Sequence, residues 1–353
     1  MRKLKKAYLK ADELPDSIEI LSKAKKVTVV RTDRLGDMVL TLPLCDRIKK
    51  RFPQAELTLI ARKYVEPLLL ESPALTNYLF IDDYKKGIRD IFKQNKFDAA
   101  FFPRPRFEEA FEGFRSKIPL RAGSGYRAYS IFFNNRVYMH RKKSSMHEAE
   151  HNLYLLSSIT KEKYKPVLVK PAVQEQSMYK VKEILNSDGL NSSDDFVIIH
   201  PGSGGSAYDW SAENFGKLAN IITQKTDYKI VLTGIEPEKK QCKIVQDNCK
   251  NAINICSKLS LSELIALISF AKLLVANSTG VLHIAAALDI PVAGLYPNTL
   301  HISQKRWGPY TENAIIFNPP LSDDKGVSDN MSLILPEVVA DGILGRLLLN
   351  HDS

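Results

Sequence analysis

Short apolar runs recur along the chain and alternate with longer stretches in which apolar residues have helical spacing. This alternation is typical of βα units that build parallel sheets. A first series predicts strands at 26–31, 55–61, 77–82 and 97–102, with helices near 37–51, 64–71 and 85–95. A second series predicts strands at 195–202, 228–234, 252–256, 271–277 and 291–297, again with helices between them.

The two series predict an α/β protein with two doubly wound domains. A length of 353 residues fits, since a domain commonly takes about 100–200 residues. Pro and Lys, followed by turn residues, place the join within 160–194, so we expect domains at 1–170 and 171–335. The last segment, 336–353, begins with Pro336 and has the pattern of a helix, which can pack on either domain, including back on the first.

Composition is ordinary for a globular protein, with 44% hydrophobic and 25% charged residues. Four cysteines without a C-x-x-C pair favour neither a disulfide framework nor a zinc ribbon. The basic N-terminus lacks the apolar core of a secretory signal, and no apolar run reaches the roughly 20 residues of a membrane span. We therefore expect a soluble cytoplasmic protein.

Charge is distributed unevenly. Residues 1–150 hold 31 Lys and Arg against 19 Asp and Glu, a net of +12, whereas residues 151–353 carry a net of −2. Such an asymmetry indicates an acidic partner for the first half, such as a phosphorylated glycan, an anionic membrane face or nucleic acid, or simply a basic solvated surface. No nucleic-acid-binding motif accompanies the charge, so we expect no nucleic-acid partner.

A glycine turn after the first strand delivers Asp37 to the start of a helix. Ligands of open α/β sheets bind beyond the carboxyl ends of the strands, where this turn lies, so Asp37 is a candidate for chemistry. Asp also favours the N-cap of a helix, so a purely structural cap is the alternative.

A second candidate is the turn from His200 to Ala207, which carries Ser203 and Gly204 and lies between a strand and a helix. Glycines let backbone N–H groups approach an anion closely, which is one way to hold phosphate. Gly202, Gly204 and Ala207 also fit a degenerate form of the dinucleotide-binding pattern, so an NAD site is an alternative, as is a plain connector.

A third candidate follows the predicted strand 271–277. Ser278, Thr279 and Gly280 form a turn that opens a helix, and His283 lies one turn inside it. Hydroxyls, free helix N–H groups and an imidazole can converge there on a diphosphate. The structural alternative is a helix cap with a core histidine.

Four segments in this order resemble the glycosyltransferase family that contains the ADP-heptose:lipopolysaccharide heptosyltransferases. They are RTDRLGDMVLTLP, HPGSGGSAYDW, LSLSELIALISFAKLLVANSTGVLHIAAALDIPVAGLYP and RWGP. The resemblance runs from about residue 26 to 318. It implies the GT-B architecture, in which two Rossmann-like domains face each other across a cleft, with the donor nucleotide in the C-terminal domain and the acceptor on the N-terminal one.

The resemblance also implies roles. Asp37 matches the family's catalytic base, and Glu238, with Glu236 as a rival, matches the position that meets the nucleoside. The other donor contacts it implies are Ser203, Gly204, Ser278, Thr279, Gly280 and His283. Acceptor contacts are expected from the basic residues of the first half, Arg31, Arg34, Arg104, Arg106 and Arg127.

Two positions depart from the family pattern. Tyr208 stands where heptosyltransferases usually carry Lys, and Ser278 stands where they often carry Asp. No Asp-x-Asp occurs, and the spacing of Cys242, Cys249 and Cys256 does not aim three thiols at one point, so neither a metal nor another cofactor is expected.

The sequence therefore predicts an inverting, metal-independent transfer of a sugar, heptose from ADP-heptose, to a lipopolysaccharide-core-type acceptor. The acceptor would be a phosphorylated glycolipid at the inner membrane surface, with the enzyme peripheral there. The alternatives are an NAD-dependent oxidoreductase and a catalytically silent nucleotide-sugar-binding protein. The sequence leaves the oligomeric state open.

Overall fold

The computed structural model describes residues 10–12, 16–139, 145–191, 194–205 and 208–349. The chain divides into two compact units, Met1–Val169 and Lys170–Ser353. The division falls within the Pro- and Lys-bearing segment that separates the two series of strands.

The first unit is built on a sheet of seven strands in the order β1-β7-β6-β5-β2-β3-β4. All neighbours pair in parallel except the edge strand β1, which is antiparallel to β7. The strands are β1 (Lys10–Asp12), β2 (Lys26–Val30), β3 (Glu56–Ala61), β4 (Asn77–Phe80), β5 (Ala99–Phe102), β6 (Leu120–Ser124) and β7 (Asn135–Tyr138). From β2 to β7 this order is the Rossmann order 3-2-1-4-5-6.

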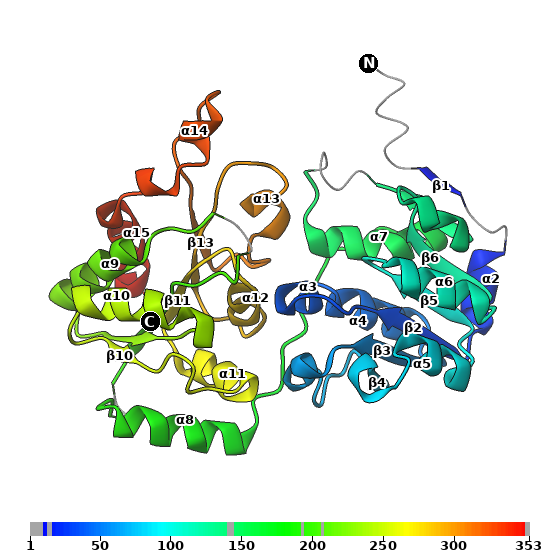
Figure 1. Ribbon diagram of the computed structural model, residues 1–353, viewed down its shortest axis with the longest axis horizontal. Helices are drawn as coiled ribbons and strands as arrows, with labels where there is room; N and C mark the ends of the chain where they lie inside the picture. The colour runs from blue at the N-terminus through cyan, green and yellow to red at the C-terminus, as the bar shows by residue number, and fades with distance from the viewer. Residues whose placement is uncertain (1–9, 13–15, 140–144, 192–193, 206–207, 350–353) are drawn as a thin grey trace. The chain divides into compact units, whose positions relative to one another are not determined.

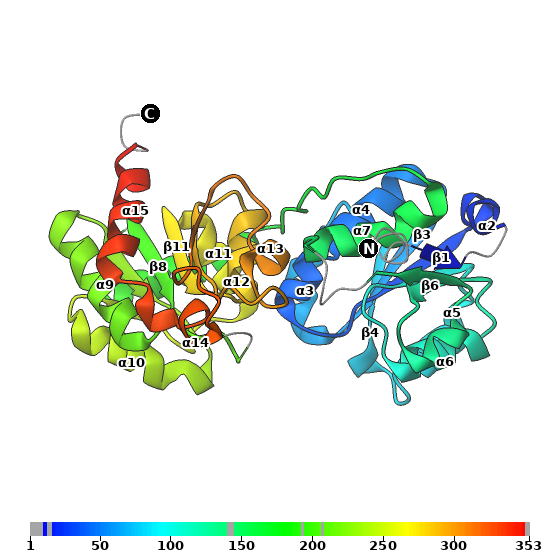
Figure 2. The ribbon, with the colours of Figure 1, turned by 90° about the horizontal axis from the view of Figure 1, so that it is seen from above.

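Helices cover both faces of this sheet (Figure 1, Figure 2). One face carries α2 (Ser17–Lys23), α4 (Leu42–Arg51) and α7 (Glu148–Thr160), and the other carries α5 (Ile88–Asn95) and α6 (Phe107–Arg115). Short elements complete the unit: α3 (Leu35–Val39), η1 (Lys63–Leu68), η2 (Ile81–Asp83) and η3 (Ala128–Phe132). Because both faces are covered, β5 is buried along its whole length, as parallel strands usually are.

Two predicted helices of the first unit differ from the structure. The helix expected at 37–51 is two helices, α3 and α4, and Pro43 stands in the first turn of α4. Proline lacks a backbone N–H and suits a helix start better than a helix interior, so one continuous helix is not formed. The helix expected at 64–71 is the 3₁₀ segment η1, which contains Pro67.

The second unit repeats the same topology. Its six parallel strands have the order β10-β9-β8-β11-β12-β13, again 3-2-1-4-5-6. They are β8 (Phe196–His200), β9 (Lys229–Leu232), β10 (Ile253–Asn254), β11 (Leu273–Asn277), β12 (Val292–Leu295) and β13 (Ala314–Phe317). The expectation of two doubly wound α/β domains is confirmed.

Helices again cover both faces of the sheet. One face carries α9 (Ala212–Lys225), α10 (Lys239–Asn248) and α15 (Pro336–Leu349), and the other carries α8 (Glu175–Ser187), α11 (Leu261–Phe270) and α12 (Gly280–Ala287). The shorter elements are η4 (Glu236–Glu238), α13 (Gln304–Trp307), α14 (Lys325–Ser328) and η5 (Met331–Leu333).

The C-terminal helix α15 packs on α9 and β13, in the second unit. Val339, Ala340, Ile343 and Leu347 are buried in that unit's core cluster. Of the two placements that the sequence left open for this helix, the structure has the one on the second unit. Its apolar side belongs to the core cluster that also contains buried side chains of β8, β9 and β11.

Strands β6, β7 and β13 were not predicted from the sequence. Each is only four or five residues long, and β6 and β7 carry Arg121 and Arg136 within the strand. A short apolar run that a charged residue interrupts has little hydrophobic periodicity. Its conformation depends on pairing with neighbouring strands, and this pairing cannot be seen in the local sequence. Within the described residues, no helix has the length and apolar character needed to cross a membrane.

We expect Ile343→Ala to destabilise the second unit by about 2–5 kcal/mol, because it leaves a cavity among fully buried neighbours. Both tryptophans of the chain, Trp210 and Trp307, lie in this unit, so denaturant unfolding followed by tryptophan fluorescence reports on it. Val338→Ala on the same helix is the matched control, because Val338 is 56% exposed and its loss should cost less than about 0.5 kcal/mol. Equal midpoints for the two variants would contradict the packing of α15.

Candidate functional site

The first group of candidate residues lies where the strand order of the first sheet reverses. β2 is flanked by β3 on one side and by β5 on the other, so the connections leaving β2 and β5 run in opposite directions. Such a switch point leaves a crevice at the carboxyl ends of the two strands, where open α/β sheets bind ligands. Residues 31–37 follow β2, and residues 103–106 follow β5.

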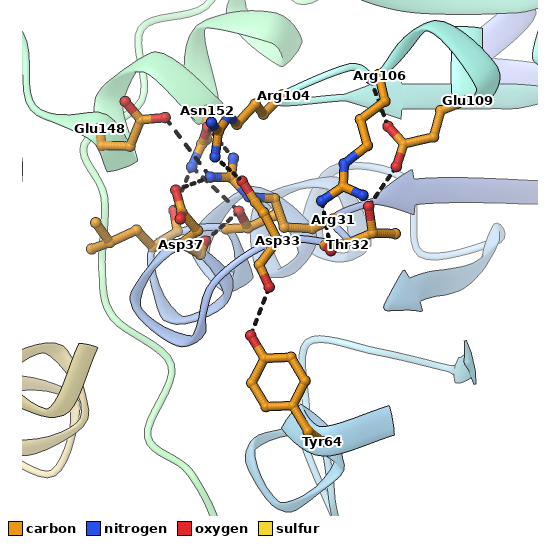
Figure 3. Close-up of polar contacts among 12 residues, drawn as sticks. Arg31, Thr32, Asp33, Asp37, Tyr64, Arg104, Arg106, Glu109, Glu148 and Asn152 are labelled. Atoms are coloured by element: carbon orange, nitrogen blue, oxygen red, sulfur yellow. Dashed lines mark hydrogen bonds and ion pairs between the residues drawn. The ribbon is translucent and has the colours of Figure 1, made fainter. Parts of the chain in front are cut away.

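Arg31 is the centre of this group, with 1% of its surface exposed (Figure 3). Its guanidinium forms an ion pair with the Asp37 carboxylate, and its Nε lies 2.6 Å from Oδ1 of Asp33. The carboxylate of Glu148, at the start of α7, lies 4.0 Å from Nη2. Three carboxylates thus surround one buried guanidinium.

Hydrogen bonds to uncharged side chains hold the same group in place. The Asn152 side chain on α7 accepts from Arg31 Nη1 at 3.5 Å and donates to the carbonyl of Leu40 at 2.9 Å. The Thr41 hydroxyl donates to the carbonyl of Asp37 at 2.7 Å. The short helix α3 is therefore tied to α4 and α7, and Asp37 has little freedom to move.

The charges of the group oppose one another. Burial disfavours the charged form of Arg31, but Asp37, Asp33 and Glu148 outweigh it and raise the pKa of the guanidinium. Burial also raises the pKa of the Asp37 carboxyl. The positive charge of Arg31 acts against this rise, and the negative charges of Asp33 and Glu148 add to it. Asp37 is thus a more basic carboxylate than an ordinary aspartate, and it is fixed in orientation by an arginine.

The loop after β5 adds two exposed arginines. Arg104 lies 2.9 Å from Oδ2 of Asp33, and Arg106 donates to the carbonyl of Thr32 at 3.4 Å. The Thr32 hydroxyl in turn donates to Glu109 at 2.5 Å (Figure 3). The structure thus brings Arg31, Arg104 and Arg106 together around the β2 loop.

The other two acceptor candidates lie on neighbouring loops. Arg34 is exposed at the N-cap of α3, and Arg127 is exposed just before η3, after β6. Tyr129 joins the β6 and β5 loops by donating to the carbonyl of Pro105 at 2.7 Å. Tyr64, in η1 after β3, was missed by the sequence analysis; its hydroxyl donates to the carbonyl of Asp33 at 2.6 Å.

The second group of candidates lies at the corresponding switch point of the second sheet, between β8 and β11. The glycine turn follows β8, and the Ser278–Gly280 turn follows β11. Gly204 and Gly205 have φ values of +57° and +70°, a conformation that favours glycine. Ser206 and Ala207 of this turn lie outside the described residues.

Glu238 packs against this glycine turn. A Cβ at Gly202 would lie 2.0 Å from the Glu238 side chain, so only glycine allows this approach. The Glu238 carboxylate accepts from the N–H groups of Gly204 at 3.2 Å and Ile235 at 2.9 Å. The rival candidate Glu236 is exposed and pairs with Lys239 at 2.8 Å. Of the two, only Glu238 contacts the glycine turn.

Beneath the turn lies the buried His200. Its Nδ1 is 3.0 Å from the Thr233 hydroxyl, and its Nε2 is 3.7 Å from Glu238. Burial lowers the pKa of His200, although Glu238 acts in the opposite direction. Burial therefore disfavours a positive charge on this imidazole, whereas the Glu238 carboxylate favours it.

Asn277 connects the two ends of the glycine turn, a role that the sequence analysis did not assign. Its side-chain oxygen accepts from the N–H of Trp210 at 2.8 Å, and its side-chain nitrogen donates to the carbonyl of Pro201 at 2.8 Å. Asn277 is fully buried at the end of β11. Asn277, the last residue of β11, thus holds the two ends of the glycine turn that follows the neighbouring strand β8.

The turn after β11 leads directly into α12. Ser278 is 8% exposed and Thr279 and Gly280 are partly exposed, and His283 is buried one turn inside the helix. Thr279 is the N-cap, but its side chain makes no capping hydrogen bond. The first N–H groups of an α-helix have no partners within the helix, and the Thr279 side chain does not cap those of α12.

The two departures from the family pattern have different surroundings. Tyr208 is 57% exposed on the glycine turn, whereas Ser278 is buried and hydrogen-bonds to Tyr296. The Tyr296 hydroxyl donates to the carbonyl of Trp307, in the RWGP segment, at 3.0 Å. Among the described residues, no group of three or more His, Cys, Asp or Glu is placed to hold a metal ion.

Comparison with known proteins gives the same family for sequence and fold. Residues 88–332 match glycosyltransferase family 9 (heptosyltransferase). The chain is 26% identical to lipopolysaccharide heptosyltransferase 3 of Escherichia coli over 302 residues, which cover 80% of this chain and 84% of that one. It is 27% identical to a lipopolysaccharide core heptosyltransferase of Haemophilus influenzae over 293 residues, which cover 77% and 79%.

Solved structures share the fold. A family 9 glycosyltransferase from Veillonella parvula has a TM-score of 0.80 at 19% identity, covering 92% of this chain and 97% of that chain. The ADP-heptose lipopolysaccharide heptosyltransferase II of Escherichia coli has a TM-score of 0.77 at 20% identity, covering 92% and 99%. The two Rossmann-like sheets are those of the GT-B architecture. The family match spans more than half of the sequence, and the chain belongs to glycosyltransferase family 9, the heptosyltransferase family.

Proposed function

We propose that this glycosyltransferase transfers heptose from ADP-heptose to a hydroxyl of a lipopolysaccharide-core-type glycolipid, with inversion at the anomeric carbon and Asp37 as the general base. The observation that carries the proposal is the buried Asp37 carboxylate, fixed by Arg31 at the switch point of the first sheet. The curated relatives that the chain resembles are lipopolysaccharide heptosyltransferases, which supports the sugar and the acceptor class.

Asp37 would accept the proton of the attacking acceptor hydroxyl. The new glycosidic bond forms as the bond between the anomeric carbon and the phosphate oxygen breaks, and the diphosphate leaves with the bonding electrons. A raised pKa suits a base, because proton transfer is most effective when the pKa approaches the working pH. Arg31 favours the ionised form of the carboxylate and orients it, and Arg104 and Arg106, which contact Asp33 and the Thr32 carbonyl, would bind phosphates of the acceptor.

The second unit supplies the donor contacts of the proposal. Backbone N–H groups of the glycine turn and of the first turn of α12 would face the diphosphate, with Ser203, Thr279 and His283 beside them. Such groups stabilise the negative charge that develops on the leaving group. No resident metal or other cofactor enters this scheme.

The oxidoreductase alternative has less support. A dinucleotide-binding pattern places its third small residue at the start of the helix. Here α9 begins only at Ala212, five positions beyond Ala207, which lies outside the described residues. A catalytically silent nucleotide-sugar-binding protein would bind ADP-heptose and show no turnover, so ADP release distinguishes it from an enzyme.

We expect Asp37→Asn to lower turnover by about 100-fold or more, because the change keeps the shape of the side chain and removes its basicity. The measurement is ADP release with ADP-heptose and a lipopolysaccharide-core acceptor, alongside calorimetric binding of the donor, which should change by less than a few-fold. Asp46→Asn on α4, whose carboxylate pairs with an exposed lysine, is the matched control and should retain activity. Turnover above about a tenth of wild type in Asp37→Asn would exclude the base assignment.

The pH profile provides a separate prediction. Only the ionised carboxylate can accept a proton, and the pKa of Asp37 is raised, so kcat/KM should fall on acidification at a pH above the ordinary aspartate value of about 3.9. Glu148→Gln removes a neighbouring negative charge that raises this pKa, so the acid limb should move to lower pH. Glu213→Gln, at an exposed site on α9, should leave the limb in place. If Glu148→Gln leaves the acid limb of the pH profile where it is, the limb reports the titration of a group other than Asp37.

The departure at Tyr208 predicts weak binding of ADP-heptose. A charge-assisted hydrogen bond is worth about 1.5–3 kcal/mol, so Tyr208→Lys should strengthen donor binding by about ten-fold or more in calorimetric titration. Tyr179→Lys is the matched control, because Tyr179 is 69% exposed on α8 of the same unit. If Tyr208→Lys gives no gain over this control, another cation such as Lys305 already fills the role.

A further inference from the structure

The first unit exposes a cluster of large apolar side chains on α6 and η3. Phe107 is 59% exposed, Phe114 is 47% exposed and Ile131 is 69% exposed. Phe111 and Phe132 lie between them and are partly exposed. We call these five residues the α6–η3 face. Contiguous apolar surface of this kind on a protein marks an interaction site more often than scattered single residues do.

The rings of this face pack on one another. The centroids of Phe107 and Phe111 are 5.9 Å apart in a stacked arrangement. Phe132 lies 6.1 Å from Phe107, 5.4 Å from Phe111 and 5.4 Å from Phe114. The face is therefore a pre-ordered platform, and covering it requires little loss of side-chain freedom.

Basic residues are frequent in the segment that carries the platform. Between residues 104 and 132 the chain carries six Lys and Arg and only three Asp and Glu. Two of the three acids, Glu109 and Glu112, are buried, which leaves Glu108 as the exposed one. The basic residues are Arg104, Arg106, Arg115, Lys117, Arg121 and Arg127.

Some of this positive charge is already paired. Arg104 contacts Asp33 at 2.9 Å, and Arg115 contacts Glu112 at 3.5 Å. Arg121 lies over the Phe114 ring at 5.6 Å and donates to the carbonyl of Phe132. Even so, the exposed surface of the segment is predominantly positive.

We propose that the α6–η3 face docks the enzyme on the surface of a bilayer that contains anionic lipids. Exposed aromatic and aliphatic side chains enter the boundary between headgroups and acyl chains, while the cations of the same segment contact lipid phosphates. Charge complementarity selects this occupant. The aromatic side chains match the apolar part of an anionic membrane interface, and the basic residues near them match its phosphates. The inference rests on the proposed function in one respect, namely that the acceptor is a glycolipid.

The face is linked to the proposed base. Arg106 is the N-cap of α6, and its guanidinium donates to the carbonyl of Thr32, next to Arg31. Figure 2 shows α6 beside α5 on one side of the sheet, and the β5 loop that precedes α6 leads back to the switch point. Docking through α6 would therefore hold the Asp37 site close to the headgroup layer, where the sugars of a glycolipid lie.

The test is flotation of the full chain with vesicles of phosphatidylcholine alone and of phosphatidylcholine mixed with phosphatidylglycerol, at low and high salt. We expect binding to the anionic vesicles, weakened by salt, and little binding to phosphatidylcholine alone. Ile131→Glu should lower the partition coefficient by about ten-fold or more, because it removes an inserted apolar group and adds a repelled charge. Leu321→Glu is the matched control, since Leu321 is 87% exposed in the second unit, and it should bind as wild type does.

Phe107→Ser is a second variant that adds no charge and should also weaken vesicle binding, with circular dichroism confirming that it folds. Failure of the wild type to bind anionic vesicles, or equal binding by Ile131→Glu, would overturn the proposal. A dimer in light scattering that Ile131→Glu converts to monomer, without vesicle binding, would assign the face to a second copy of the chain. Vesicle binding needs no sugar donor, so its failure is distinguishable from a failure of ADP release.

Discussion

The ion pair between Arg31 and Asp37 is the interaction on which the first unit's site depends. A buried guanidinium without partners would be costly, and here three carboxylates and an asparagine side chain surround it. Removing any one carboxylate changes the electrostatic balance of the others. The site therefore acts as a unit, in which Arg31 fixes the Asp37 carboxylate while burial and the surrounding carboxylates raise the pKa of that carboxyl.

The second unit uses the same topology with different chemistry. At its switch point the polar contacts are mostly to backbone groups: Asn277 closes the glycine turn, and Glu238 accepts from the N–H of Gly204. Burial lowers the pKa of the histidine beneath the turn. The N-terminus of α12 suits a multiply charged anion, because the helix dipole and the first backbone N–H groups provide attraction without a buried cation.

The two sites and the α6–η3 face together suggest how the uneven charge of the sequence is used. The basic excess belongs to the first half of the chain, and part of it lies in the segment that carries the aromatic platform next to Arg106. Within the proposed function, an acceptor anchored in a membrane and a soluble nucleotide sugar would meet different units of the same enzyme. Such a division would suit a first unit that is basic and a second unit that is weakly acidic.

The sequence by itself determined the two doubly wound domains, because buried parallel strands leave unmistakable apolar runs at regular intervals. It also located the Asp37 turn, the glycine turn and the Ser278–Gly280 turn, since glycines and hydroxyls after strands are local signals. Short strands such as β6 and β13, and the packing of α15 on the second unit, depended on tertiary contacts that no local pattern encodes. The hydrogen bonds of Asn277 to the glycine turn and the contact of Glu238 with Gly202 likewise join residues far apart in the chain, which only the folded structure brings together.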